Sequence, residues 1–180
     1  MLARLHSDHK HIAILLKLLN NKQERLEKGE VVNFNLIRDV VEYMQSYAEH
    51  SHHPLEDLIN DFYSQAYPAE MLDRKLAQEH ETLSENSSQL MATLNLILSD
   101  VPVQIEQLNQ TIKDYVSMQK AHMLYEEEVI FPMWQQGFSE QDWQVLNAKC
   151  QERLISDPLF SDDDNLVFEE LREYIAKAEE

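Results

Sequence analysis

Two stretches of the sequence place histidines and carboxylates within one helical turn of each other. They are HSHHPLED at residues 50–57 and HMLYEEEVIFP at residues 122–132. Glu56 follows His52 by four positions. Glu126 follows His122 by the same interval, so in a helix each acid shares a face with its histidine. Imidazole and carboxylate together suit iron, manganese or zinc. The stretches therefore predict a metal site, and the simpler alternative is a solvated charged surface.

Every long helical pattern in the sequence carries one histidine on its own apolar stripe. The histidines are His9, His52, His80 and His122, and the last stripe runs Ile105, Leu108, Ile112, Tyr115, Gln119, His122, Glu126, Val129, Met133. A single histidine on such a stripe is usually a hydrogen-bonded core residue. These histidines, however, stand at matching distances from the intervening turns, within about three residues or roughly 5 Å. We therefore expect four imidazoles to meet in one layer of a helical bundle.

The cost of burying charge gives a second reason to expect metal ions. Glu126 falls on the apolar stripe, and a buried carboxylate without a partner is expensive. A pair of divalent cations would neutralise it together with Glu56. The neighbouring polar residues are predicted to be solvated or supporting groups, with Glu127 and His53 as alternative ligands. These neighbours are His6, His11, His50, His53, Asp57, Glu127 and Glu128, with Tyr47 and Tyr125 expected near the layer.

The predicted elements are four long helices followed by a shorter helical segment. We expect helices at about residues 2–28, 34–66, 68–98 and 102–134, with boundary signals at Gly29, Asn33, Pro68 and Gly137. Residues 1–136 are interpreted as an antiparallel up-down-up-down four-helix bundle, and residues 137–180 as a helical extension packed on it. SEQD at 139–142 is typical of a capping box with Asp in place of Glu. The extension is expected to cover apolar surface, and a homodimer contact is the alternative.

The composition limits the classes of partner. The chain has 15 Lys and Arg against 33 Asp and Glu, a formal net charge of −18, which argues against nucleic acid. Cys150 is the only cysteine, so we expect a buried thiol and no intramolecular disulfide. No signal-peptide pattern opens the chain, and no apolar run approaches the roughly 20 residues that span a bilayer. A cytoplasmic protein without a membrane partner is expected. The acidic run SDPLFSDDDN at 156–165 is predicted to be a solvated loop, in preference to a cation-binding loop, because its spacing does not match a calcium loop.

In order and spacing these residues resemble the hemerythrin-like family, the HHE cation-binding domain. The motifs that carry the resemblance are DHKHI at 8–12, HHPLED at 52–57, EHETL at 79–83 and HMLYEEEVIFP at 122–132, over about residues 2–135. The resemblance implies a four-helix bundle with a non-haem di-iron centre that binds O2 or NO, or senses or holds iron. It also implies that Glu56 and Glu126 bridge the iron ions. One ion would be bound by His9 and His52, and the other by His80 and His122.

One position departs from the oxygen-carrying hemerythrins. Those proteins place a further histidine one turn beyond the third-helix ligand, where this chain has Ser84. The remaining set resembles the bacterial di-iron proteins of iron–sulfur cluster repair and the nitrosative stress response. It is also similar to the iron-sensing hemerythrin domain of a ubiquitin-ligase subunit. Fewer ligands leave more open positions, which favours reactivity or labile metal over oxygen carriage.

Three rival functions stay open from the sequence alone. A ferritin-like oxidase needs a Glu-x-x-His motif on each of two helices. Glu49 and His52 supply one motif, but Gln119 occupies the place of the second acid. A metal-free interaction bundle would use the histidines only for packing. Hydrolytic zinc or manganese chemistry fits the same ligands, because ligands alone do not choose the metal. The sequence favours a binding or sensing protein over an enzyme, with iron as cofactor and zinc or manganese as alternatives.

Overall fold

The fold is helical throughout the part of the chain that the structure describes. The computed structural model describes residues 1–67, 73–151, 153–160 and 168–179, and all regular elements in these ranges are helices. The predicted all-α class is therefore confirmed for these ranges. The expected helix start at Pro68 lies outside the described residues. None of the described helices is both long enough and apolar enough to cross a membrane.

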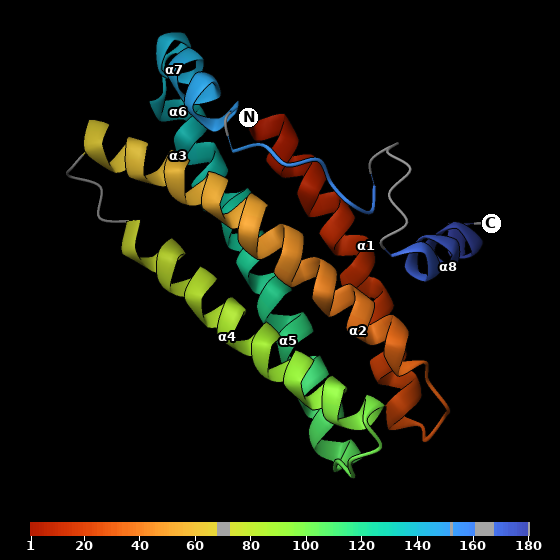
Figure 1. The fold of residues 1–180 in the computed structure, drawn as a ribbon. Coiled ribbons are helices and arrows are strands. Elements are labelled where there is room, and N and C mark those ends of the chain that lie inside the picture. The colour runs from red at the N-terminus through yellow and green to blue at the C-terminus, as the bar shows by residue number, and fades with distance from the viewer. Residues whose placement is uncertain (68–72, 152, 161–167, 180) are drawn as a thin grey trace.

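Four helical rods run side by side along the molecule (Figure 1). The first rod is α1 (Leu2–Glu27) and the third is α4 (Asp73–Leu98). The second is continuous through α2 (Phe34–Tyr43), the π-helix η1 (Met44–His52) and α3 (His53–Ala66). The fourth is continuous through α5 (Ile105–Tyr125), the π-helix η2 (Glu126–Ile130) and α6 (Phe131–Gly137). Helix α1 packs against α2 and α5, and α4 packs against the same two helices. The rods thereby enclose a common interior.

The connection between the first two rods follows the turn chemistry expected from the sequence. Gly29 lies in the left-handed region just beyond the end of α1, with a φ of 73°, where a side chain would strain the backbone. Asn33 then caps α2, because its side chain accepts hydrogen bonds from the backbone N–H groups of Asn35 and Leu36. These residues fix where the first rod ends and the second begins.

A polar layer divides the buried core into two apolar clusters. On each rod, the fully buried residues of one cluster end before the predicted histidine, and those of the other begin after it. On α1, for example, Leu5 belongs to one cluster and Ile12 to the other, with His9 between them. Apolar packing on both sides holds the polar layer at a fixed height. A layer buried in this way is costly unless its polar atoms have partners.

Both rods that carry a His-x-x-x-Glu pair contain a π-helical segment at that pair. Segment η1 ends at His52, and η2 begins at Glu126. A π-turn closes an i→i+5 hydrogen bond and so holds more residues per turn than an α-helix. A proline follows each segment, Pro54 in α3 and Pro132 in α6. Proline lacks an N–H and crowds the carbonyl four residues earlier, so a wider turn before it relieves that conflict.

The second π-segment changes which residues face the core beyond it. Regular helical spacing predicts Val129 and Met133 on the core-facing stripe, and for Val129 this prediction is wrong. Val129 is 39% exposed, whereas Ile130 and Trp134 are fully buried. Met133 is only partly buried. The extra residue in η2 rotates the rest of the rod, so the stripe moves one position along the chain.

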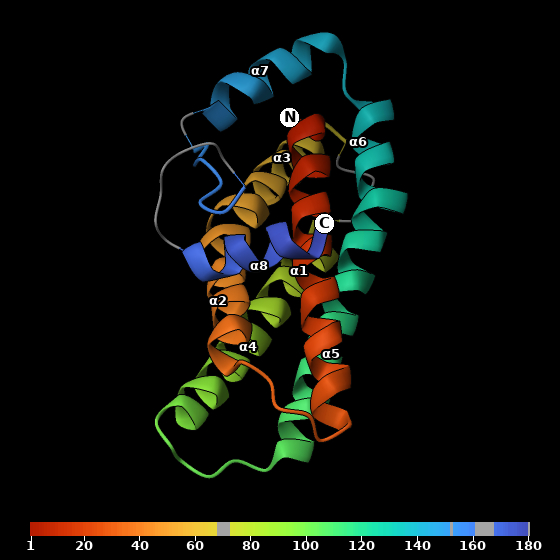
Figure 2. The ribbon, with the colours of Figure 1, turned by 90° about the vertical axis from the view of Figure 1, so that its right-hand side faces the viewer.

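The C-terminal extension adds α7 (Glu140–Gln151) and α8 (Glu169–Glu179). Helix α7 contacts α3 across one end of the rods, and α8 contacts α2 on their side (Figure 2). The capping box predicted at the start of α7 forms. The Ser139 N–H donates to the Asp142 carboxylate over 2.9 Å, and the Asp142 N–H donates to the Ser139 hydroxyl over 3.3 Å.

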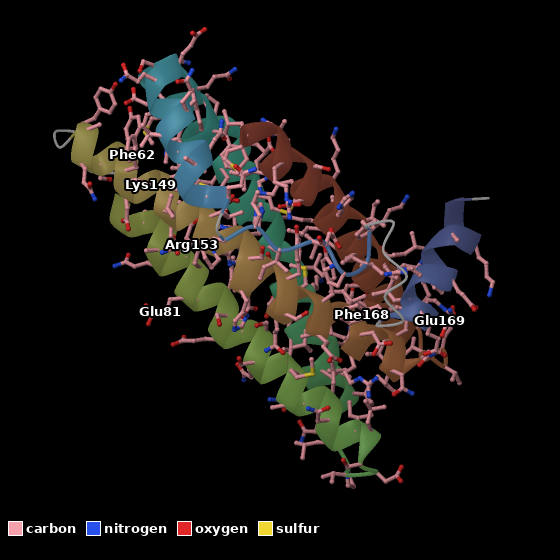
Figure 3. The ribbon with its side chains drawn as sticks, turned by 45° about the horizontal axis from the view of Figure 1, so that its top comes forward. Phe62, Glu81, Lys149, Arg153, Phe168 and Glu169 are labelled. Carbon is pink, nitrogen blue, oxygen red and sulfur yellow. The ribbon has the colours of Figure 1, made fainter. Side chains whose placement is uncertain are left out.

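Helix α7 covers apolar surface at the end of the rods. Its Leu146 and Cys150 are fully buried in the same cluster as Trp134. Lys149 extends over the ring of Phe62 on α3, with the ammonium 5.0 Å from the ring centre (Figure 3). Cys150 is thus a packed, free thiol among the described residues.

Candidate metal centre

The layer between the apolar clusters contains the four predicted histidines and both predicted glutamates. All six side chains are buried. The imidazole Nε2 atoms face the two carboxylates, at distances of 3.2 Å for His52 Nε2–Glu56 Oε1, 3.4 Å for His80 Nε2–Glu56 Oε2, 3.2 Å for His9 Nε2–Glu126 Oε2 and 3.0 Å for His122 Nε2–Glu126 Oε1. The structure thus brings together, from all four rods, the four histidines and two glutamates that the sequence suggests first as ligands.

Each glutamate presents its two oxygens to different histidines. Glu56 faces His52 with Oε1 and His80 with Oε2. Glu126 faces His9 with Oε2, while its Oε1 faces the opposite side of the layer. The candidate ligand atoms accordingly form two groups that share Glu56. They are His9, His52, Glu56 and Glu126, and His53, Glu56, His80 and His122. A carboxylate shared in this way can join two cations through its two oxygens.

The outer nitrogen of each of these four histidines is held by a carboxylate from another rod. The pairs are His52 Nδ1–Asp8 (3.1 Å), His80 Nδ1–Asp57 (2.9 Å), His122 Nδ1–Glu79 (3.0 Å) and His9 Nδ1–Glu127 (2.7 Å). In chain order each rod gives its acid to the histidine of the next rod, and the last rod gives its acid to the first. The pairs therefore close a ring around the layer. An Nδ1–H that donates to a carboxylate fixes the tautomer that leaves Nε2 free to bind a metal ion.

Asp8 and Glu79 were not predicted as supports, although the sequence contains a signal. Each of them directly precedes one histidine of the layer and supports another histidine on the next rod. The other supports, Asp57 and Glu127, directly follow the two glutamates. The first and third rods thus share an acid–histidine pair, and the second and fourth share His-x-x-x-Glu followed by an acid. The repeat becomes informative only once the rods are placed in a ring.

His53 lies inside the layer, so of the places predicted for it the solvated one is wrong, while a supporting or ligating place fits. It is 5% exposed. Its ring stacks on that of His80, with centroids 4.1 Å apart and planes 5° apart, and meets His122 edge-on at 5.5 Å. Regular α-helical counting turns His53 about 100° away from His52. The wider winding of η1, which ends at His52, changes this register and lets both side chains enter.

The remaining histidines lie outside the layer. His50 is exposed, and His6 contacts Glu127 from the solvent side at 2.9 Å. His11 contacts Asp157 at 3.1 Å. Asp157 belongs to the acidic run predicted to be a solvated loop, but it is only 9% exposed, so that prediction is wrong at this residue. Residues 161–165 of the run lie outside the described residues.

The polar atoms of the layer fit a metal site better than a hydrogen-bonded core. Five inward-facing atoms lack a hydrogen-bond partner among the described residues, namely His9 Nε2, both oxygens of Glu56, His122 Nε2 and Glu126 Oε2. Buried polar atoms are normally hydrogen-bonded, and leaving one unsatisfied is costly. These atoms lie 3.0–3.4 Å from a nitrogen or oxygen of the same layer, close enough for ion pairs but without hydrogen-bond geometry. Cations between them would satisfy all of them together.

The electrostatics of the layer are those of paired imidazolium and carboxylate groups. Burial alone would raise the pKa of Glu126, but the imidazoles of His122, His80 and His9 hold it well below its usual range. Burial would lower the pKa of His52, yet Glu56 and Asp8 raise it to about 10. The pKa of His80 is raised to about 11, because Asp57, Glu126 and Glu56 outweigh its burial. Metal ions must therefore displace protons from these histidines.

His53 titrates in the opposite direction. Burial lowers its pKa well below the usual range, and the neighbouring His80, His52 and His122 lower it further. It is therefore a neutral imidazole at neutral pH. A neutral imidazole next to Glu56 has the form that a metal ion binds.

The metal-free protein is expected to be most stable near pH 6.5. The raised pKa values of His52 and His80 stabilise the fold fully below about 6.5, and this stability is lost as the pH rises through about 10 and 11. The lowered pKa of His53 acts oppositely, since its stability is lost as the pH falls below about 6.5. Thermal melts of metal-free protein across this range check the prediction. A melting temperature that climbs steadily from neutral to alkaline pH would contradict it.

Surface cavities lined by described residues reach the layer from two sides. One, of about 700 Å³ between α1 and α5, touches His9 and Glu127. The other, of about 330 Å³ between α4 and α5, touches His122 and Glu79. In both, a partly exposed carboxylate that holds a histidine also borders the cavity. A small molecule that approaches the layer from either side therefore passes a supporting acid.

The fold and the layer together define a class of protein. A helical protein with buried imidazoles, shared carboxylates and an acid behind each outer nitrogen is built to bind metal ions. The family comparison agrees, since the hemerythrin HHE cation binding domain matches residues 1–134. The chain belongs to this family, and the resemblance noted from the sequence motifs is confirmed. Membership implies that its histidine and glutamate clusters bind metal ions. No curated protein and no solved structure matches the chain.

Proposed function

We propose that residues 1–136 form an up-down-up-down four-helix bundle that holds a pair of iron ions. The ligands are His9, His52, Glu56 and Glu126 around one ion, and Glu56, His80, His122 and Glu126 around the other. The observation that carries this proposal is the convergence of unsatisfied, buried nitrogen and oxygen atoms into two groups that share Glu56. Imidazole and carboxylate also suit zinc and manganese. The di-iron character implied by the sequence motifs favours iron.

We assign the protein a binding or sensing role, toward O2 or NO or toward iron itself, in preference to turnover. A bound iron pair would supply a redox-active centre with open coordination positions for a diatomic ligand. The chain's own residues have the remaining tasks. The carboxylate ring fixes the imidazole tautomers, and the apolar clusters on both sides of the layer limit the access of water.

The experiment that tests this function is a measurement of metal content in freshly purified protein, with optical spectra before and after reduction and exposure to air. The proposal expects about two iron ions per chain, the stoichiometry of di-iron carboxylate bundles. It also expects ligand-to-metal absorption that bleaches on reduction. Zinc alone, or no metal after anaerobic reconstitution with iron, would overturn the iron centre. Changes in the spectrum on addition of O2 or NO then separate the two ligands.

A second function, in iron–sulfur cluster repair and the nitrosative stress response, uses the same centre. This function predicts that the reduced protein binds NO and keeps its metal ions afterwards. The ferritin-like oxidase has less support. Glu49 accepts a hydrogen bond from Ser87, and Gln119 donates to Tyr115 over 3.2 Å, so neither joins the ligand groups. A Glu49→Gln variant with a slowed rate of iron oxidation would favour the oxidase.

The position of His53 leads to a separate prediction. We expect His53→Ala to weaken the binding of the metal ion next to His80 and His122, because a ring nitrogen of His53 lies among the ligand atoms of these two histidines. Loss of a ligand or of a ligand's neighbour typically costs about 10–100-fold in metal affinity. The matched control is His50→Ala, since His50 is exposed three positions earlier. Calorimetric titration of metal-free protein with Zn2+ measures both affinities. Equal binding by the two variants would leave His53 as a packing residue.

We propose no nucleic-acid and no membrane partner. The net charge of −18 supports the first exclusion. For the extension, residues 137–180, we propose a role on the bundle of its own chain, supported by the burial of Leu146 and Cys150. A homodimer that uses the extension is the alternative, and sedimentation of the full chain distinguishes the two. A cytoplasmic location stays a prediction.

A further inference from the structure

One of the four carboxylates that hold the histidines of the layer differs from the other three. Asp57, Glu79 and Glu127 have side chains that are 30–45% exposed, whereas Asp8, which holds His52, is 4% exposed. A carboxylate that is held away from water needs partners of its own. The partners of Asp8 therefore bear on how firmly His52 is placed.

Arg4 supplies the positive charge next to this buried acid. Its Nε lies 3.5 Å from Asp8 Oδ1. Its Nη2 donates to the hydroxyl of Tyr47 over 2.6 Å, and that hydroxyl donates to Asp8 Oδ1 over 3.2 Å. The remaining carboxylate oxygen of Asp8, Oδ2, accepts from His52. Both oxygens of Asp8 are thus fixed, one by Arg4 and Tyr47 and the other by the histidine.

The C-terminal extension supplies a further hydrogen-bond partner for Arg4. The same Nη2 atom that contacts Tyr47 also donates to the backbone carbonyl of Ile155 over 2.6 Å. Two residues further on, Asp157 accepts a hydrogen bond from the Tyr43 hydroxyl over 2.9 Å, which ties this segment to α2. Residues 153–160 lie beyond the matched domain, which ends at residue 134. A segment outside the metal-binding domain therefore helps to hold a residue that orients one of its histidines.

We propose that Arg4 is a positioning residue of the metal centre and that the C-terminal extension holds it in place. In this arrangement Ile155 fixes the guanidinium, Arg4 and Tyr47 fix Asp8, and Asp8 fixes the Nδ1–H of His52. This series of contacts reaches only the ligand group that contains His9 and His52. The effect of Arg4 on metal binding therefore falls on one side of the centre. The consequence for metal binding rests on the function proposed above.

The test compares Arg4→Met with Arg172→Met. Arg172 also donates to carbonyls of the extension, those of Pro158 and Leu159, but among the described residues its hydrogen bonds reach neither Asp8 nor the partners of Asp8. In metal-free protein, nuclear magnetic resonance of the histidine rings reports the Nδ1–H of His52. Arg4→Met is expected to increase the exchange of this proton with water, and Arg172→Met is expected to leave it unchanged. Unchanged exchange in Arg4→Met, or an equal increase in both variants, would overturn the proposal.

A Zn2+ titration followed by the same ring signals measures the consequence for metal binding. In Arg4→Met, the signals of His9 and His52 are expected to need roughly tenfold more Zn2+ to shift, the lower end of the usual cost of losing an outer support. Those of His80 and His122 are expected to respond as in the unaltered protein. Equal weakening on both sides would overturn the positioning role. If the unaltered protein bound no Zn2+, the proposed function would fail while the exchange measurement on metal-free protein still tested Arg4.

Two further variants keep the test decisive if Arg4→Met folds poorly. Arg4→Lys retains the charge beside Asp8 but lacks the planar fork that reaches Tyr47 and Ile155 together, so we expect partial rescue. Asp157→Ala loosens the extension without touching Arg4 and is expected to shift His52 in the same direction by a smaller amount. An unchanged His52 signal in Asp157→Ala would overturn the part played by the extension.

Discussion

Replacing Glu126 with glutamine is expected to abolish the uptake of both metal ions. Glu126 approaches histidines on both sides of the layer, with His9 facing one oxygen and His122 the other. A neutral amide keeps the size of the side chain, but it offers one acceptor oxygen and no negative charge. Because each cation loses a ligand, we expect affinity to fall by more than about 100-fold, the upper end of the cost of losing an outer support. Metal analysis of the purified variant measures the loss.

The matched control for this prediction is Glu128→Gln. Glu128 lies two residues further along the same π-segment and is exposed. It makes the same chemical change in the same local backbone, so any effect of the charge on η2 appears in both variants. Full metal content in the control, together with loss in Glu126→Gln, supports the bridge. Full metal content in both variants would show that Glu126 does not bridge.

The candidate ligands, which the structure brings together in one layer, could be chosen from the sequence because the information that marks them is local. Glu56 follows His52 by four positions, which in any helix places both on one face. Gly29 marks the end of α1 through its backbone conformation, and Asn33 marks the start of α2 through capping. Both are also local effects. The heights of the histidines follow from counting between such boundaries. This counting tolerates an error of a few residues, because long side chains can reach over that distance.

The residues that the sequence failed to place depend on the backbone register within two rods. One extra residue in a π-turn moves Ile130 into the core in place of Val129, and a similar segment brings His53 beside His52. The prolines that follow the segments were available as a signal. A proline inside a continuous apolar pattern conflicts with regular α-helical hydrogen bonding and indicates a local irregularity. It does not specify which way the register changes, and that depends on the packing of the whole layer.

The pairing of each supporting carboxylate with its histidine could not be predicted from the sequence, and the reason is different. Asp8 supports His52, which is 44 positions away, and not the adjacent His9. Such a pairing depends on which rods are neighbours and on their rotation about their own axes. The same holds for Asp157, whose burial depends on where the extension crosses α1 and α2. Acidic composition predicts a solvated loop there, but two partners of Asp157, His11 and Tyr43, come from the first quarter of the chain.

Removing the metal with a chelator is expected to lower the melting temperature on the order of 10 °C, from about 4 kcal/mol of linkage at free metal near 1,000 times its dissociation constant. The loss is large because the ligands come from all four rods, so one layer ties the entire bundle together. Calorimetry of the full chain with and without metal measures it. His9→Ala is the matched variant, since it removes one of those ties, and it is expected to retain less than half of the metal-dependent shift. A shift of the same size in both proteins would mean that metal binds elsewhere. No shift in the unaltered protein would leave the histidine layer as a metal-free core.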